Sequence, residues 1–257
     1  MHKLKADYYS ISKSSAIFTG IIFGVFNFCL HSLDIVYYDY GAFMIFVGRE
    51  NEANHIIREL QGGNNIVLGG KYGIGRTSLI KYLASRFINE WRIVFVDFSQ
   101  TPWKMSEKLI RELGLSMRFR KTGKKMGYKS MRYRIANVQS PKKMKTVIVF
   151  DNVAKLTPQK IIFLQHLILE KHFQFIAIVE NFLPKNDLFS LKAQLLPATK
   201  ICLSNLNAKT VLNFLQSYSD KYHLNWSDAY IHNLANLIRG HPLSMIEMIR
   251  NIKRGNI

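Results

Sequence analysis

The sequence predicts an α/β fold, with a three-layer αβα sandwich around a parallel sheet and a small all-α subdomain after it. Short, almost continuously apolar runs alternate with amphipathic stretches as far as residue 203. Apolar strands that alternate with helices are typical of a parallel sheet covered on both faces. Beyond residue 203 the strand-like runs stop and only helical patterns follow.

Four strands, each with a helical pattern after or near it, are expected before that point. The strands are predicted at residues 64–69, 92–98, 146–150 and 173–179, with helices at 77–87, 104–113 and 158–171. Three further helices are predicted at residues 208–224, 227–238 and 242–252. The chain is thereby divided into an N-terminal extension (1–43), a core (44–203) and a helical lid (204–257).

Composition narrows the classes of protein. The 257 residues are 48% hydrophobic with a mean hydropathy of -0.02, which excludes a wholly disordered chain and a polytopic membrane protein. The net charge of +19 favours an anionic partner, meaning nucleic acid, nucleotide or an acidic membrane surface. The two cysteines, Cys29 and Cys202, lack metal-ligand spacing, so a zinc site and a disulfide framework are not expected. A reducing compartment, the cytoplasm, is predicted.

Residues 14–33 carry no acidic residue, lysine or arginine, and 20 residues are long enough to cross a bilayer. Asn27 and His31 weaken that interpretation, and the basic residues up to Lys13 would place the rest of the chain outside the cytoplasm. Three interpretations stay open. The segment is a buried or partner-bound apolar helix, a membrane anchor, or an upstream extension whose functional start is Met44.

Residues 70–77 (GKYGIGRT) fit the phosphate-binding spacing GxxxxGK[ST], with arginine in the lysine position. A strand is predicted before them and a helix after them. The candidate phosphate-binding residues are Gly70, Lys71, Tyr72, Gly73, Ile74, Gly75, Arg76, Thr77 and Ser78. Glycines let the backbone N–H groups wrap a triphosphate, and a helix N-terminus adds partial positive charge. ATP with Mg²⁺ is therefore expected, with the Thr77 hydroxyl on the metal. Arg76 keeps the charge of lysine but is larger and planar, so it changes how a γ-phosphate would be placed.

Residues 146–152 (TVIVFDN) form an apolar strand that ends in an acid. An aspartate at the carboxyl end of a central strand is suited to hold the magnesium shell, so Asp151 is the second metal candidate.

The order of these motifs resembles the AAA+/STAND group of P-loop ATPases, especially small prokaryotic and archaeal initiator-like members. Residues 46–50 (FVGRE) resemble the box that opens such domains, and residues 240–243 (GHPL) resemble the GxPL motif of their lid. The likeness covers about residues 44–257. It implies that Val47, Gly48 and Arg49, together with Pro242, border the adenine. Because no winged-helix domain follows the lid, DNA contacts are expected elsewhere.

The resemblance also implies catalytic positions. Asn152 stands where such ATPases often carry a water-activating acid, and an amide cannot act as a general base, so hydrolysis is expected to be slow or replaced by a nucleotide switch. Asn181 is expected to read the γ-phosphate, with Glu180 a competing choice. Arg239 or Arg250 would supply a lid cation, or both are solvated.

Residues 116–145 contain eleven basic residues and no acidic residue, interleaved with Phe119, Tyr128 and Tyr133. One hypothesis is contact with a nucleic-acid backbone, without sequence readout. The expected contacts are Lys124, Lys125, Lys129, Arg132 and Arg134. The alternative is a mobile, solvated insertion whose charge serves solubility.

The sequence as a whole predicts an ATP-binding AAA+/STAND-type ATPase in the cytoplasm, acting as an ATP-dependent switch or motor with DNA. A homo-oligomer or a partner protein is compatible with this interpretation. The alternative is a non-catalytic nucleotide-binding signalling or scaffold protein, tethered to a membrane if residues 14–33 anchor it.

Overall fold

The computed structural model describes residues 47–119, 121–138, 144–169 and 171–254. The extension 1–43, with its apolar run, lies outside the described residues. The chain divides into two compact units, Met1–Val47 and Gly48–Ile257, and every element below belongs to the second. Within the described ranges, no helix has the length and apolar character needed to cross a membrane.

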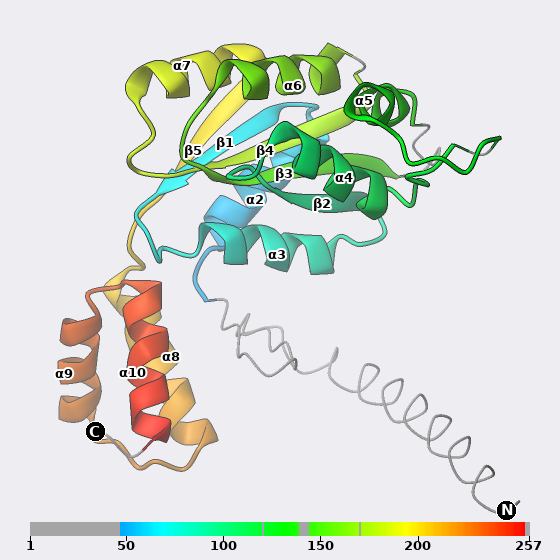
Figure 1. The fold of residues 1–257 in the computed structure, drawn as a ribbon. Helices are drawn as coiled ribbons and strands as arrows, with labels where there is room; N and C mark the ends of the chain where they lie inside the picture. The colour runs from blue at the N-terminus through cyan, green and yellow to red at the C-terminus, as the bar shows by residue number, and fades with distance from the viewer. Residues whose placement is uncertain (1–46, 120, 139–143, 170, 255–257) are drawn as a thin grey trace, which may run out of the picture. The chain divides into compact units, whose positions relative to one another are not determined.

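The sheet has the order β2-β3-β4-β1-β5, and every neighbouring pair is parallel (Figure 1). Its strands are β1 (Asn65–Gly70), β2 (Trp91–Asp97), β3 (Lys145–Val153), β4 (Phe173–Val179) and β5 (Ala198–Leu203). The parallel sheet is confirmed, but the expected number of four strands is wrong. The strand β5 lies at an edge and is only partly buried, so its sequence lacks the continuous apolar run of the central strands.

Helices cover both faces of the sheet (Figure 1). One face is covered by α4 (Pro102–Glu112), α5 (Tyr128–Ala136), α6 (Pro158–Leu169) and α7 (Lys185–Gln194), and the other by α2 (Glu50–Gln61) and α3 (Arg76–Arg86). Alternate residues of a strand point to opposite faces. Because helices cover both faces, the side chains on both sides of β3 are buried. Phe150 packs toward α4–α7, with its ring centroid 5.8 Å from that of Phe175 and 6.4 Å from that of Phe163. The three-layer sandwich is confirmed.

Three of the helices, α2, α5 and α7, are not among those expected from the sequence. In α5 the basic residues mask a short apolar stripe, of which Met131 and Ile135 are fully buried. In α7 only Leu191 is buried, so this helix shows almost no amphipathic pattern.

The last three helices are α8 (Ala208–Lys221), α9 (Asp228–Ile238) and α10 (Pro242–Lys253), close to the ranges expected. The side chains of Asn207 and Ser227 cap the first two, and Pro242 occupies the first turn of the third. These helices share an apolar core of their own, which includes Phe214 and Leu234. The helical subdomain is confirmed. Its boundary with the core at residue 203 stays a prediction, since Gly48–Ile257 form one unit.

Candidate functional site

The glycine-rich loop joins β1 to α3 at the carboxyl edge of the sheet. Gly70 has φ +148°, and a Cβ there would lie 2.9 Å from Cγ2 of Ile74 and 3.0 Å from the carbonyl oxygen of Leu203. Gly75 precedes α3 with φ +92°, and no described side chain caps this end of the helix. The loop therefore requires glycines, and the first N–H groups of α3 lack a capping side chain, as an anion site requires. Lys71 and Tyr72 are exposed, Ser78 is half-buried and Ile74 is buried.

The two residues expected to hold magnesium lie side by side. The Thr77 Oγ1 atom lies 3.1 Å from Oδ1 and 3.2 Å from Oδ2 of Asp151, and the two side chains are hydrogen-bonded. Adjacent ligands of an octahedral Mg²⁺ with bonds of about 2.1 Å are separated by about 3.0 Å. The spacing of these two oxygens therefore fits neighbouring positions in one Mg²⁺ shell. No cluster of three or more potential metal-binding His, Cys, Asp or Glu side chains occurs among the described residues. Such a cluster is not needed, because protein-bound Mg²⁺ usually keeps several waters and substrate oxygens.

Arg76 does not extend freely into the loop. Its side chain is 7% exposed, Nη2 lies 2.8 Å from Oε2 of Glu180, and Nη1 donates to the carbonyl oxygen of Val179. The guanidinium is thus bound at the end of β4, next to the strand from which the loop emerges. Binding a phosphate through Arg76 requires this ion pair to open or to be shared, so that role stays a prediction.

The turn after β4 contains both candidates for reading a γ-phosphate. Asn181 is exposed there, whereas Glu180 is half-buried and ion-paired with Arg76. The structure therefore brings Glu180, the competing choice, into contact with the phosphate-binding loop.

Asn152 and Asp97 form a second polar pair at the same edge. Asn152 is exposed with φ +59°, and its Nδ2 donates to Oδ1 of Asp97 over 3.3 Å. Asp97 ends β2 and is paired in register with Asp151. Partial burial by itself raises the pKa of Asp97, but hydrogen bonds from Ser99, Gln100 and Asn152 outweigh it and hold the pKa below its ordinary value. The sequence analysis missed Asp97, and an acid that closes an apolar strand was the available signal.

Lys160 is a buried cation beside this pair, and it too was missed. Its Nζ donates to the carbonyl oxygen of Phe98 over 2.5 Å and lies 4.8 Å from the centroid of the Phe98 ring. Burial lowers the pKa of Lys160, and the nearby Asp97 carboxylate works against that shift. The lysine therefore holds the backbone that follows Asp97.

The lid motif contacts the glycine-rich loop directly. The N–H of Leu243 donates to the carbonyl oxygen of Gly73 over 3.2 Å, and Nε2 of His241 lies 2.9 Å from the carbonyl oxygen of Tyr72. Pro242, the predicted adenine neighbour, stands between these two contacts at the start of α10.

Two residues of the FVGRE box, Gly48 and Arg49, make close contacts with the loop and with the residues after β5. Arg49 is buried and donates to the carbonyl oxygens of Ile74 (3.3 Å) and Ser204 (2.6 Å). A Cβ on Gly48 would lie 2.3 Å from Cγ2 of Thr210 in α8. Val47 is half-buried and is the last residue of the first unit. The adenine contacts of these three residues stay predictions.

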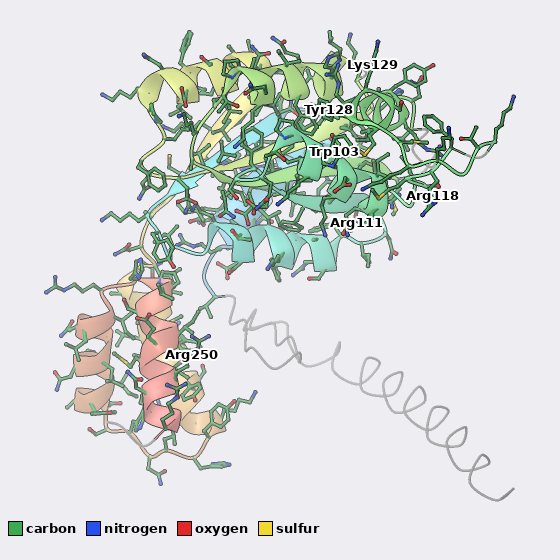
Figure 2. The ribbon with its side chains drawn as sticks, viewed as in Figure 1. Trp103, Arg111, Arg118, Tyr128, Lys129 and Arg250 are labelled. Carbon is green, nitrogen blue, oxygen red and sulfur yellow. The ribbon has the colours of Figure 1, made fainter. Side chains whose placement is uncertain are left out.

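The two lid arginines are exposed in the structure. Arg250, labelled in Figure 2, lies eight residues after Pro242, about 12 Å along α10 from the end that contacts the loop. Arg239 caps α9 with φ +50°. These positions fit the interpretation that both arginines are solvated.

The basic stretch 116–145 is partly a folded structure. Residues 117–119 and 121–126 pair in an antiparallel arrangement, in which the N–H of Phe119 donates to the carbonyl oxygen of Lys124 over 3.0 Å. Tyr128–Ala136 follow as α5, packed on α4 and α6. The described cations of the stretch therefore lie on a folded scaffold.

Aromatic and basic side chains gather where α4 meets this stretch (Figure 2). The exposed Trp103 ring lies 6.4 Å from the ring of Tyr128, and Nζ of Lys125 lies 6.0 Å from the Trp103 centroid and 3.0 Å from Oε1 of Glu107. We call this region, comprising the exposed parts of residues 103–111, 118–119 and 121–134, the α4–α5 surface.

The five expected nucleic-acid contacts differ in exposure. Lys124, Lys125 and Lys129 are exposed, whereas Arg132 and Arg134 are half-buried. The guanidinium of Arg132 contacts the His166 ring and lies 5.3 Å from the Tyr128 centroid, so it is partly used within the protein. The sequence analysis missed Trp103, which lies outside the basic stretch.

No family model and no curated protein matches this sequence. Solved structures do resemble the chain. They include Aeropyrum pernix Orc1 in a complex with DNA (12% identity, TM-score 0.56) and the Thermotoga maritima RuvB Holliday junction branch migration motor (15%, 0.54). They also include Saccharomyces cerevisiae Hsp104 in a complex with casein (17%, 0.50). The matches cover 80%, 81% and 79% of this chain but only 59%, 63% and 36% of those chains.

Proposed function

From the AAA+ P-loop ATPase fold that these neighbours show, we propose that the chain binds and hydrolyses Mg-ATP as a cytoplasmic switch or motor of STAND type. The observation that carries this proposal is the 3.1 Å hydrogen bond from Thr77 Oγ1 to Asp151, which joins the end of the glycine-rich motif to β3. Loop N–H groups would bind the phosphates, and Thr77 and Asp151 would hold Mg²⁺, which would neutralise charge on the γ-phosphate when bound.

The partner that we propose is nucleic acid, bound on the α4–α5 surface. Exposed lysines there would neutralise phosphates, and the Trp103 and Tyr128 rings offer stacking surfaces. The fold does not select this partner, since the neighbours include one structure with DNA and one with casein. The charge of the surface is the argument for nucleic acid, and binding through the backbone predicts strong salt dependence.

The test is turnover of Mg-ATP by purified protein, with and without duplex DNA, beside an Arg76→Ala variant. Turnover that rises with DNA and is lost in the variant supports the proposal. Nucleotide binding is measured separately with a fluorescent ATP analogue, because binding and hydrolysis can fail independently. A protein that fails to bind the analogue contradicts the proposed function altogether.

A second candidate is a non-catalytic nucleotide-gated signalling or scaffold protein. Two observations favour it: the ion pair that occupies Arg76, and an amide at position 152. Binding of the ATP analogue without turnover in any condition would support this alternative.

A further inference from the structure

We propose that Asp97 is the general base for ATP hydrolysis, taking the role for which Asn152 lacks a carboxylate; this inference rests on the proposed ATPase function. The strand register carries the first step of the argument. Asp97 is the last residue of β2, and its register partner Asp151 lies two residues before the end of the neighbouring parallel strand β3. Such strands lie about 4.8 Å apart. Asp97 therefore emerges at the same edge as the candidate magnesium ligand, one strand away.

The second step is the contact with Asn152. Its Nδ2 donates to Oδ1 of Asp97 over 3.3 Å, so a carboxylate lies within hydrogen-bond reach of the very residue that replaces the expected acid. The N–H of Ser99 (2.9 Å) and Nε2 of Gln100 (3.2 Å) also donate to Asp97 and fix its orientation.

The third step is availability. The described carboxylates at this edge include Glu180, which is ion-paired with Arg76, and Asp151, which is bonded to Thr77. Asp97 is exposed to water and accepts hydrogen bonds from three neutral donors, Ser99, Gln100 and Asn152. The nearby cation Lys160 donates its hydrogen bond to the carbonyl oxygen of Phe98. A carboxylate that is exposed to water can accept a proton from a water molecule beside it.

The reaction balances as follows. The oxygen of a water beside Asp97 forms a bond to the γ-phosphorus while the bond from that phosphorus to the β,γ-bridging oxygen breaks. The electron pair of the broken bond leaves on ADP. The proton of the attacking water passes to a carboxylate oxygen of Asp97 and is then returned to the phosphate product.

The experiment exchanges the two groups of the pair in the full chain. The variants are Asp97→Asn, Asn152→Asp and the double variant Asp97→Asn/Asn152→Asp. An amide at position 97 can still accept the hydrogen bond from Ser99, and aspartate tolerates the left-handed backbone at position 152. Turnover, affinity for the fluorescent ATP analogue and thermal unfolding are measured for all four proteins.

We expect Asp97→Asn to lower turnover by about 10²–10⁴-fold, the usual contribution of a general base, with the affinity for the analogue retained. The double variant should recover at least about tenfold of that loss, because the carboxylate returns one side chain away. A residue that only caps the turn after β2 would give no such recovery.

Four results would overturn the inference. Two of them contradict the base role and leave the proposed function standing. They are an Asp97→Asn variant that turns over ATP at the wild-type rate, and a double variant that is no more active than Asp97→Asn. Wild-type protein that binds the analogue without hydrolysing ATP removes both the base and the ATPase activity. Absence of binding removes the proposed function as a whole.

Discussion

The carboxyl edge of the sheet and the α4–α5 surface use polar residues in opposite ways. At the edge, side chains are largely engaged with one another: Thr77 with Asp151, Arg76 with Glu180, and Asn152 with Asp97. On the α4–α5 surface, lysines such as Lys124 and Lys129 project into solvent from a turn and a short helix. A hydrogen-bonded or ionic pair loses its function when one member is replaced, whereas exposed cations each add a small share of the binding free energy.

The largest effect on turnover is predicted for residues at the carboxyl edge of the sheet. Replacing Thr77 by Val, which keeps the shape but removes the hydroxyl, should lower Mg²⁺-dependent turnover by at least about 10²-fold, because one ligand of the metal is lost. Phosphate release at increasing Mg²⁺ concentration measures the effect.

Thr199→Val is the matched control for that variant. Thr199 lies near the start of β5, at the opposite end of the sheet, and its hydroxyl donates to Glu59. Equal losses in the two variants would mean that the edge has no special role.

The second effect concerns the pair that occupies Arg76. Glu180→Gln should raise the affinity for the ATP analogue by about tenfold, since the phosphates no longer compete with a charged partner worth about 1.5–3 kcal/mol. The same change should lower the melting temperature of the nucleotide-free protein, because a buried guanidinium loses its counter-charge.

The distinguishing result is a higher affinity for the ATP analogue together with a lower melting temperature. Glu59→Gln serves as the control, since Glu59 is hydrogen-bonded to Asn64 and Thr199 away from the carboxyl edge. Unchanged or weaker nucleotide affinity in Glu180→Gln would show that the ion pair does not restrain Arg76.

The third effect is moderate and belongs to the α4–α5 surface. Changing Lys124, Lys125 and Lys129 together to Gln should reduce the slope of log affinity against log salt for nucleic acid by about 2–3, at about 0.7–0.9 per lost phosphate contact. Each single change should give about a third of that. Fluorescence anisotropy with labelled DNA at several salt concentrations measures the slope.

A charge-matched control separates local contact from net charge. Lys185, Lys200 and Lys209 are exposed and lie on α7, β5 and α8, and changing them to Gln removes the same three charges. Equal slopes in the two triple variants would contradict a dedicated nucleic-acid surface.

The smallest effect is on acid stability. The pKa of Asp97 lies below its ordinary value of 3.8, so its stabilising contribution is complete above that value and is lost as the pH falls through the lowered pKa. Thermal unfolding between pH 2 and 6 should show that wild-type protein loses its advantage over Asp97→Asn only in the most acidic part of this range. An advantage that disappears near neutral pH would contradict the lowered pKa.

Much of the site was visible in the sequence because local patterns determine it. A loop that needs left-handed or crowded backbone needs glycine, as at Gly70 and Gly75. The central strand β3 is apolar on both faces up to Asp151. Thr77 and Asp151 were each assigned to the metal from their own motifs, and the structure brings them together at the carboxyl edge. The edge strand β5 and the helix α5 were missed because half-exposed elements carry weak patterns.

The sequence alone therefore determined the sandwich, the helical subdomain and the candidate phosphate-binding loop, since periodicity and glycine positions are local properties of the chain. Only the tertiary structure decided which charged groups meet. Arg76 lies 104 residues from Glu180, and Asp97 lies 55 residues from Asn152. Such partners are set by strand order and register, which place residues from distant segments side by side at the carboxyl edge. A side chain's partner is thus a property of the packed sheet, even where its type and position are already evident in the chain.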